Sequence, residues 1–297
     1  KSDLPLLNEL LKHVFDSTGK RTRPALTLLA AGFHPHKNDH VLTMATAVEL
    51  LHVATLIHDD TVDEAETRRG RITISNAWGQ HTAVLVGDYV FASSATKVCD
   101  TGNINVIRRF SETIAELSKG QLQESAFSYD AQREIDEYFQ QIYYKTASLF
   151  STSGESGAIL SGASDDVVSH VKSYSLNIGL AFQIIDDTLD YESDSSIIGK
   201  EIGDDLSEGK VTLPMIYALE QTTGKENKIL TNAITEADAS NIDNIVDILV
   251  NVKAFEFSRN VAKDESIKAL NSLKVIPESN YRSALKLLCE LSLERQS

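Results

Sequence analysis

The 297-residue sequence predicts an all-α protein built from roughly ten or more helices. Apolar residues recur at spacings of three and four through most of the chain, as expected for helices with one buried face. The sequence lacks alternating apolar and polar stretches bounded by hairpin turns, the pattern typical of strands. No Pro/Ser-rich linker divides it, so we expect a single domain over residues 1–297. The clearest helical segments are 6–15, 41–60, 105–117, 134–150 and 167–190.

Turn residues mark the breaks between these helices. Gly and Pro punctuate the first two breaks, and the fifth offers a Ser or Asp that can cap the helix after it. A longer polar segment, 192–210, has the length and glycine content of a functional loop. From residue 222 onward we expect amphipathic helices and find no chemical motif. The five shorter breaks are 19–24, 32–40, 67–73, 99–105 and 161–166.

Charge and composition exclude several classes of protein. The formal net charge is −15, from 43 acidic and 28 basic residues, which argues against nucleic acid as the main partner. No run approaches the roughly 18 apolar residues of a membrane span, and the acidic N-terminal segment does not resemble a signal peptide. Cys99 and Cys289 lack metal or redox spacing, and we expect both to be buried in a reducing compartment. We therefore expect a cytoplasmic protein, with a mitochondrial protein whose transit peptide has been removed as the alternative.

Two short segments repeat the same arrangement of carboxylates, DDTVD at 59–63 and DDTLD at 186–190, each after an apolar run. Positions i and i+4 share one face of a helix, so the first and last acid of each segment lie together. Like charges at this spacing repel by roughly 0.2–0.5 kcal/mol per pair, and bound cations would remove the repulsion. Oxygen ligands with little His or Cys nearby favour magnesium over zinc. The six acids are Asp59, Asp60, Asp63, Asp186, Asp187 and Asp190.

Basic residues cluster beside these acids despite the acidic composition. Groups of both signs indicate a diphosphate or polyphosphate ligand, with carboxylates holding metal ions and basic side chains holding phosphate oxygens. For the first cluster taken alone, a solvated loop is the alternative. The clusters are Lys20, Arg21 and Arg23; Arg68, Arg69 and Arg71; and Lys200 with Lys210.

In this order the motifs resemble the trans-isoprenyl diphosphate synthases over residues 19–215, and in particular the long-chain octaprenyl and nonaprenyl diphosphate synthases. The resemblance implies the isoprenoid synthase fold, a helical bundle around a central cavity. It also implies a prenyltransferase that joins isopentenyl diphosphate head-to-tail to an allylic diphosphate, farnesyl or geranylgeranyl, with three magnesium ions. The segments that carry it are GKRTRP, ELLHVATLIHDDTVDEAETRRG, LVGDY, YYKTASLF, GLAFQIIDDTLD and GKEIGDDLSEGKVTLP.

The resemblance also implies roles for individual residues. Asp59, Asp63 and Asp186 match the metal ligands of the family, and Asp60, Asp187 and Asp190 match acids that hold the geometry of the site, bind water or occasionally bind a metal ion. The family positions that bind the allylic diphosphate are matched by Arg68, Lys145, Lys200 and Lys210. Those of the metal-free isopentenyl diphosphate pocket are matched by Lys20, Arg23, His52 and Arg69. Thr146 and Gln183 match residues whose oxygen atoms face the developing carbocation. With Lys145, Asp59 and Asp186 they make up the expected catalytic set.

The implied chemistry is consistent with these residue types. When the carbon–oxygen bond of an allylic diphosphate breaks, the leaving group carries a large negative charge, which divalent cations and bases stabilise. The double bond of isopentenyl diphosphate then attacks the allylic cation, and a proton must leave. No His or Glu in the acidic motifs is placed as an obvious general base. The released diphosphate is therefore the expected proton acceptor.

Small residues one helical turn before the first acidic motif predict a long product. Ala54 and Thr55 lie five and four residues before Asp59. A helical turn of about 5.4 Å is close to the length of one isoprene unit, so an aromatic residue here would stop growth early, and we expect roughly eight to ten units. The alternative is that small residues only pack helices closely, and the product is then shorter, as in geranylgeranyl or farnesyl diphosphate synthases.

Two other functions share part of this pattern of residues. A class I terpene cyclase also ionises allylic diphosphates but needs no isopentenyl diphosphate pocket. The presence of GKRTRP, His52 and Arg69 therefore argues against a cyclase. An inactive regulatory subunit would have lost acids or bases, and here all six acids remain. As partners we expect the two diphosphate substrates and a second copy of the chain, since the family forms homodimers; some long-chain relatives require a different second subunit. No nucleic acid or transmembrane segment is expected, and the lipid product would pass to a membrane.

Overall fold

The computed structural model describes residues 3–16, 19–36, 38–192 and 202–293. Its residues form two compact units, which are described separately: Lys1–Phe110 with Ser156–Ala163, and Ser111–Glu155 with Ser164–Ser297. The division between them falls inside two continuous helices, α6 (Ile104–Phe127) and α8 (Ser148–Leu160). The expectation of one domain over 1–297 stays a prediction.

The predicted all-α class is confirmed, because 79% of the structure is helical. The exception within the described residues is a small antiparallel hairpin of β1 (Thr67–Arg68) and β2 (Arg71–Ile72), in a segment expected to be a loop. Arg69 and Gly70 at its tip have φ angles of 54° and 72°, and a two-residue turn of this kind needs positive φ at both positions. Glycine adopts that conformation at little cost. The hairpin thereby fixes the backbone of the predicted basic cluster.

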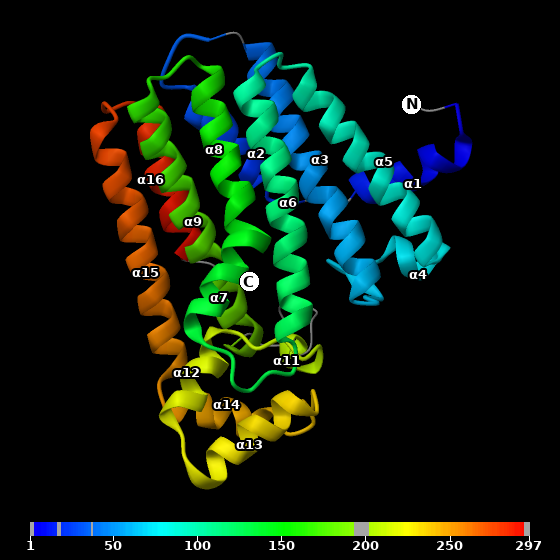
Figure 1. Cartoon of the computed structure of the whole chain (residues 1–297), viewed down its shortest axis with the longest axis vertical. Coiled ribbons are helices and arrows are strands. Elements are labelled where there is room, and N and C mark those ends of the chain that lie inside the picture. Colours follow the sequence, from blue (N-terminus) through cyan, green and yellow to red (C-terminus); the bar gives the residue numbers. More distant parts are fainter. Residues whose placement is uncertain (1–2, 17–18, 37, 193–201, 294–297) are drawn as a thin grey trace. The chain divides into compact units, whose positions relative to one another are not determined.

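The first unit is built on α3 (Asn38–Val62), which packs along α5 (Gln80–Cys99), as Figure 1 shows. Ala54 and Ile57 of α3 meet Ala83, Val86 and Val90 of α5 in one apolar cluster. Because α3 has no strongly polar face until its last turn, it forms the centre of this unit. The shorter helices around it are α1 (Pro5–Phe15), α2 (Thr22–Ala31) and α4 (Ile74–Trp78).

By length and composition alone, α3 could also cross a membrane, since an 18-residue window within Asp39–Val62 has a mean hydropathy of 1.5. Core helices pass the same test, so this is weak evidence for a span. Nearly half of that window, 44%, is buried inside the structure, and three carboxylates lie near its end. These observations favour a core helix.

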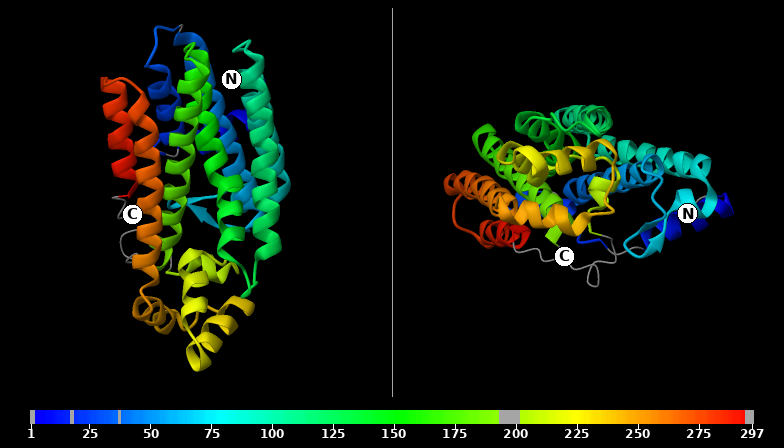
Figure 2. Two further views of the ribbon diagram at one scale, coloured as in Figure 1. Left: turned by 60° about the vertical axis from the view of Figure 1, so that its left-hand side comes forward. Right: turned by 90° about the horizontal axis from the view of Figure 1, so that it is seen from below.

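The second unit is built on α9 (Asp165–Glu192), which packs along α15 (Ala254–Ser272). The Oγ of Ser164 accepts a hydrogen bond from the amide of Val167 at 3.4 Å, the N-cap expected for this helix. Three helices gather at one end of α15 in both Figure 1 and Figure 2: α12 (Leu213–Gln221), α13 (Gly224–Thr235) and α14 (Ile242–Asn251). The remaining elements are α7 (Ile135–Ile142), η1 (Tyr143–Ala147), α11 (Asp204–Ser207), η2 (Leu273–Val275) and α16 (Asn280–Leu293).

Between α7 and α8 the chain forms one turn of π-helix, η1, which carries Lys145 and Thr146. Single π-helical turns are frequent at functional sites, because the wider turn redirects side chains. Gly120 of α6 lies directly against this turn: a Cβ added there would lie 2.4 Å from the backbone nitrogen of Lys145. The missing side chain therefore allows α6 to approach η1 backbone to backbone.

The expectation for the two cysteines was half right. Cys289 is buried, and its thiol lies 3.7 Å from the carbonyl oxygen of Ser266. Cys99 is exposed at the C-terminal end of α5, so the expectation of burial is wrong for it.

Candidate active site

The first acidic motif forms the last turn of α3. Asp59 and Asp63 are partly exposed, and the amide of Asp63 donates a 2.8 Å hydrogen bond to the carbonyl of Asp59, as helical spacing requires. Asp60 faces the other way: only 8% of it is exposed, and its carboxylate forms an ion pair with Arg68 of the hairpin. Burial raises the pKa of Asp60, while the Arg68 charge works to lower it. Asp60 therefore connects the helix end to the hairpin.

The second motif lies near the end of α9 and shows the same division. Asp186 is exposed, and Asp187 is 6% exposed. The carboxylate of Asp187 accepts hydrogen bonds from Tyr138 Oη at 2.6 Å and from Gln183 Nε2 at 2.7 Å. Burial, together with the charge of Asp205, raises the pKa of Asp187 to about 8. Asp190 is partly exposed, and its Oδ2 accepts the backbone N–H of Asp205 at 3.2 Å.

In both motifs, then, the middle acid is buried and bonded to the protein, while the outer acids are more accessible. Within the described ranges, no three His, Cys, Asp or Glu side chains are grouped closely enough to hold a metal ion by themselves. Magnesium is usually bound by one or two carboxylates together with substrate phosphates rather than by a cage of protein ligands. Two accessible oxygen ligands on one helical face fit that mode of binding.

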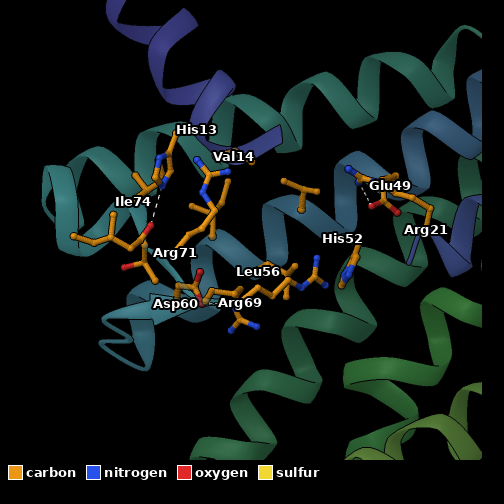
Figure 3. Close-up of a pocket in the computed structure, with 15 residues that line it drawn as sticks. His13, Val14, Arg21, Glu49, His52, Leu56, Asp60, Arg69, Arg71 and Ile74 are labelled. Carbon is orange, nitrogen blue, oxygen red and sulfur yellow. Dashed lines mark hydrogen bonds and ion pairs between the residues drawn. The ribbon is translucent and has the colours of Figure 1, made fainter. Parts of the chain in front are cut away.

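A pocket in the first unit gathers the basic residues of the hairpin and of α2 and α3; we call it the arginine pocket (Figure 3). The residues that matter for its chemistry are Arg21, His52, Asp60, Arg68, Arg69 and Arg71. Two of the arginines already have carboxylate partners, since Arg21 pairs with Glu49 and Arg68 with Asp60. The pocket keeps a surplus of positive charge and is therefore suited to an anion.

His52 lies in this pocket without carrying charge at neutral pH. Burial is the main reason why the pKa of His52 lies well below 6.5, and the positive charges of Arg23, Arg69 and Arg68 lower it further. The neutral ring can donate one hydrogen bond and accept another. Thr55, one turn further along α3, donates its hydroxyl hydrogen bond to the His52 carbonyl at 2.8 Å.

A second pocket, in the second unit, gathers side chains from α6, α7, η1, α9 and the segment around α11; we call it the lysine pocket. It brings together Lys145, Thr146, Gln183 and Lys210, all of them predicted site residues, with Asp187. Thr146 Oγ1 donates to Gln183 Oε1 at 2.7 Å, and the Gln183 amide nitrogen donates to Asp187. The amide in this apolar stretch of α9 thus has a partner on each side.

Glu124 is the residue of this pocket that the sequence analysis missed most clearly. It forms an ion pair with Lys145 and accepts a 2.7 Å hydrogen bond from Gln141 Nε2. Burial by itself would raise the pKa of Glu124, but the charges of Lys145 and Lys210 lower it below its ordinary value. Glu124 follows Gly120 by four residues. A glycine inside a polar helix indicates a close approach of another segment, and this signal could have pointed to Glu124. Also missed were Arg133, Gln141 and Asp205.

The structure does not bring every predicted residue into a pocket. Lys20 is exposed and Arg23 partly exposed, and neither lines the arginine pocket, although the Arg23 charge acts on His52. Arg68, predicted for the allylic diphosphate, lies in the arginine pocket beside Arg69. Ala54 is fully buried in the apolar cluster of α3 and α5. Lys200 lies outside the described residues.

Comparisons with known proteins agree on one family. The model of the polyprenyl synthetase family matches residues 4–251. The chain is 38% identical to an all-trans-nonaprenyl-diphosphate synthase (geranyl-diphosphate specific) of Rhodobacter capsulatus, over 99% of the chain and 90% of that protein. It is 34% identical to an octaprenyl diphosphate synthase of Haemophilus influenzae, with the same coverage. A crystal structure of a polyprenyl synthase from Caulobacter crescentus, complexed with calcium and isoprenyl diphosphate, superposes with a TM-score of 0.95 at 32% identity, covering 100% of the chain and 91% of that structure.

Proposed function

The chain belongs to the polyprenyl synthetase family, and we propose that its arginine and lysine pockets bind the two diphosphate substrates of that reaction. It is a prenyltransferase of isoprenoid biosynthesis, which elongates an allylic diphosphate with isopentenyl diphosphate to a long trans-polyprenyl diphosphate. One observation carries the assignment of the pockets: in each unit a pocket lined by at least two basic side chains adjoins an acidic motif whose middle acid is buried. This arrangement suits a metal-bound or bare diphosphate.

The family is generally dependent on divalent metal ions, and we propose magnesium, three ions in each active site. Asp59, Asp63 and Asp186 would be the main ligands, as the resemblance implies, and each is more exposed than the middle acid of its motif. When bound, the ions supply positive charge to the departing diphosphate. Asp60, Asp187 and Asp190 would support these ligands or bind a metal ion occasionally. Their carboxylates are held by Arg68, by Tyr138 and by the amide of Asp205, respectively.

The lysine pocket is proposed to receive the allylic diphosphate. Lys145 and Lys210 place two ammonium groups there, which can bind phosphate oxygens as point charges. Thr146 and Gln183 present oxygen atoms whose dipoles stabilise a developing carbocation. Because the Gln183 amide nitrogen is used by Asp187, its oxygen is turned toward Thr146 and the pocket. Arg68 and Lys200 remain proposed contributors to the same diphosphate.

The arginine pocket is proposed to receive isopentenyl diphosphate without a metal ion. Arg69 and His52 line it, and Arg23 and Lys20 precede or begin the adjacent helix α2. A guanidinium fork binds two phosphate oxygens at once, which orients the substrate as well as holding it. A neutral His52 can add a hydrogen bond without a further charge. The proton lost after condensation is proposed to pass to the released diphosphate.

For the product, we propose roughly eight to ten isoprene units, with the α3 face at Ala54 and Thr55 bordering the growing chain in steps of about one helical turn per unit. The named relatives support a long product, since they include an octaprenyl and a nonaprenyl diphosphate synthase. Farnesyl or geranylgeranyl diphosphate is the proposed primer. A homodimer and a cytoplasmic location are proposed as well, on the resemblance and on the composition.

The test is incubation of the purified chain with magnesium, labelled isopentenyl diphosphate and one allylic primer at a time, geranyl diphosphate included. Chromatography of the products against polyprenyl standards should show one dominant long chain. A dominant twenty-carbon product would contradict the chain-length proposal and leave the chemistry intact. Absence of any product with every primer would contradict the synthase function.

A further inference from the structure

We propose that Arg133 is a positioning residue that holds both lysines of the lysine pocket in place. It acts on Lys145 through a series of side chains and on Lys210 through the neighbouring backbone. The inference rests on the proposed function of that pocket as a diphosphate site. Arg133 belongs to none of the sequence motifs and would not touch the substrate itself. It acts on residues that would.

Arg133 lies just before α7, whose capping residue is Glu134, and only 6% of it is exposed. Its guanidinium donates from Nη1 to the carbonyl of Val211 and from Nη2 to Oε1 of Gln141, both at 2.6 Å. These partners come from different segments of the chain. The rigid fork of an arginine can hold both in one plane, which the single ammonium of a lysine cannot do in the same way.

The first path leads to Lys145. Gln141, held by Arg133 through its oxygen, donates from Nε2 to Oε2 of Glu124 at 2.7 Å. The other carboxylate oxygen of Glu124 holds the ammonium of Lys145. Three consecutive interactions thus join the guanidinium to the lysine, and all four side chains line the same pocket. Because each polar group has a fixed donor or acceptor role, the chain of bonds fixes where the ammonium points.

The second path leads to Lys210. Val211 directly follows Lys210, so the Arg133 bond to the Val211 carbonyl fixes the backbone next to that lysine. The amide of Lys210 donates to the carbonyl of Asp205 at 2.8 Å, which secures the backbone on the other side. Loss of Arg133 would release one of these two attachments and leave a buried carbonyl without its donor.

Packing alone does not explain an arginine at this position. The guanidinium carbon lies 5.4 Å from the ring centre of Phe127 and 5.6 Å from that of Tyr138, and such ring contacts do not require two directed hydrogen bonds. A buried charge is costly, and the hydrogen bonds from Nη1 and Nη2 offset part of that cost, while the buried Nε has no partner within the described residues. The positive charge of Arg133 also contributes to the lowered pKa of Glu124, which keeps that carboxylate ionised and able to hold Lys145.

The test compares Arg133→Met and Gln141→Leu with the matched control Arg109→Met, since Arg109 is a similarly buried arginine (8% exposed) outside the lysine pocket. Loss of supporting residues typically costs about 10–100-fold in affinity or activity. We expect Arg133→Met to raise the KM for the allylic primer by about that factor, with the KM for isopentenyl diphosphate near wild type. The double variant should add little, because both changes interrupt one path to Lys145.

Equal rises in both KM values, the same effect from Arg109→Met, or multiplied effects in the double variant would overturn the inference. If Arg133→Met fails to fold by circular dichroism, Gln141→Leu and Arg133→Lys carry the same comparison. Binding of inorganic diphosphate with magnesium, measured by calorimetry, separates this inference from the proposed function. A wild type that makes no product but binds diphosphate more tightly than Arg133→Met would contradict the function alone; equal binding by the two proteins would contradict the positioning role.

Discussion

Gln183 lies one helical turn before Asp187 on α9, and its amide nitrogen donates a 2.7 Å hydrogen bond to Oδ1 of Asp187. Its amide oxygen accepts from Thr146 of the π-helical turn at 2.7 Å. The pair joins the second acidic motif to the side chains proposed to stabilise a cation. The orientation of the amide follows from these two neighbours, because the two oxygens of Asp187 accept from Tyr138 and Gln183 while the Thr146 hydroxyl donates.

Replacing Gln183 by Glu should therefore lower kcat strongly. The new carboxylate would lie within hydrogen-bond distance of Asp187, so the two acids repel or share a proton, and the oxygen facing Thr146 is displaced. Perturbation of such a supporting contact is expected to cost about 10–100-fold. Asn177→Asp is the matched control, since this amide lies on the same helix but bonds to Ser173. Equal activities of the two variants would remove Gln183 from the catalytic set.

The outer and middle acids should respond differently to truncation. Asp186→Ala and Asp59→Ala should abolish turnover with unchanged melting temperature, because both side chains are accessible. Asp187→Ala should lower stability by about 1–3 kcal/mol, since Tyr138 and Gln183 lose a buried acceptor. Thermal unfolding and activity of the three variants check this. Full activity of Asp59→Ala would exclude it as a metal ligand.

Removal of divalent ions should stop the reaction of the unmodified protein. Chelation is expected to abolish product formation and to weaken binding of the allylic primer, and added magnesium should restore both. Binding of isopentenyl diphosphate should survive chelation, because its proposed pocket contains arginines and a neutral histidine. Loss of isopentenyl diphosphate binding on chelation would contradict the assignment of the arginine pocket.

His52 should make the protein less stable in acid. Its pKa is lowered in the folded state by burial and by neighbouring arginines, while the unfolded chain titrates near 6.5. Between these two values the unfolded chain binds more protons, so the free energy of unfolding falls as pH drops below 6.5, by at most about 1.4 kcal/mol per pH unit. His52→Gln should remove this part of the slope in denaturant unfolding between pH 5 and 8. The exposed His81, changed to Gln, is the control, and an identical slope in both variants would count against the mechanism.

Ala54→Phe should shorten the product if this face of α3 borders the growing chain. Because Ala54 is fully buried, the larger side chain should also cost about 1–3 kcal/mol of stability. Thr55→Phe is the companion variant, since Thr55 is only half-buried and offers more room. Product chromatography of both folded variants decides: unchanged chain length in the two would place the growing chain along another helix.

The sequence by itself determined the helical class and the contents of both acidic motifs. Helical periodicity is local, so the spacing of Asp59 and Asp63, or of Asp186 and Asp190, could be placed on one face without knowledge of the fold. The basic clusters, and the resemblance that they support, follow from the same short segments. The hairpin around Arg69 was missed, because two paired residues on each side leave too short a pattern to recognise.

Tertiary packing decided which acid of each motif is buried and what holds the lysines. Spacing along a helix does not distinguish Asp60 from Asp59; the difference comes from Arg68, which the hairpin folds back onto the helix end. Arg133 bonds to a carbonyl 78 residues further along the chain, and Glu124 meets Lys145 because Gly120 lets two helical segments approach. Contacts between such distant residues depend on how helices pack. The sequence therefore predicted the acidic and basic residues proposed to bind metal and diphosphate, and the fold determined which other side chains position them.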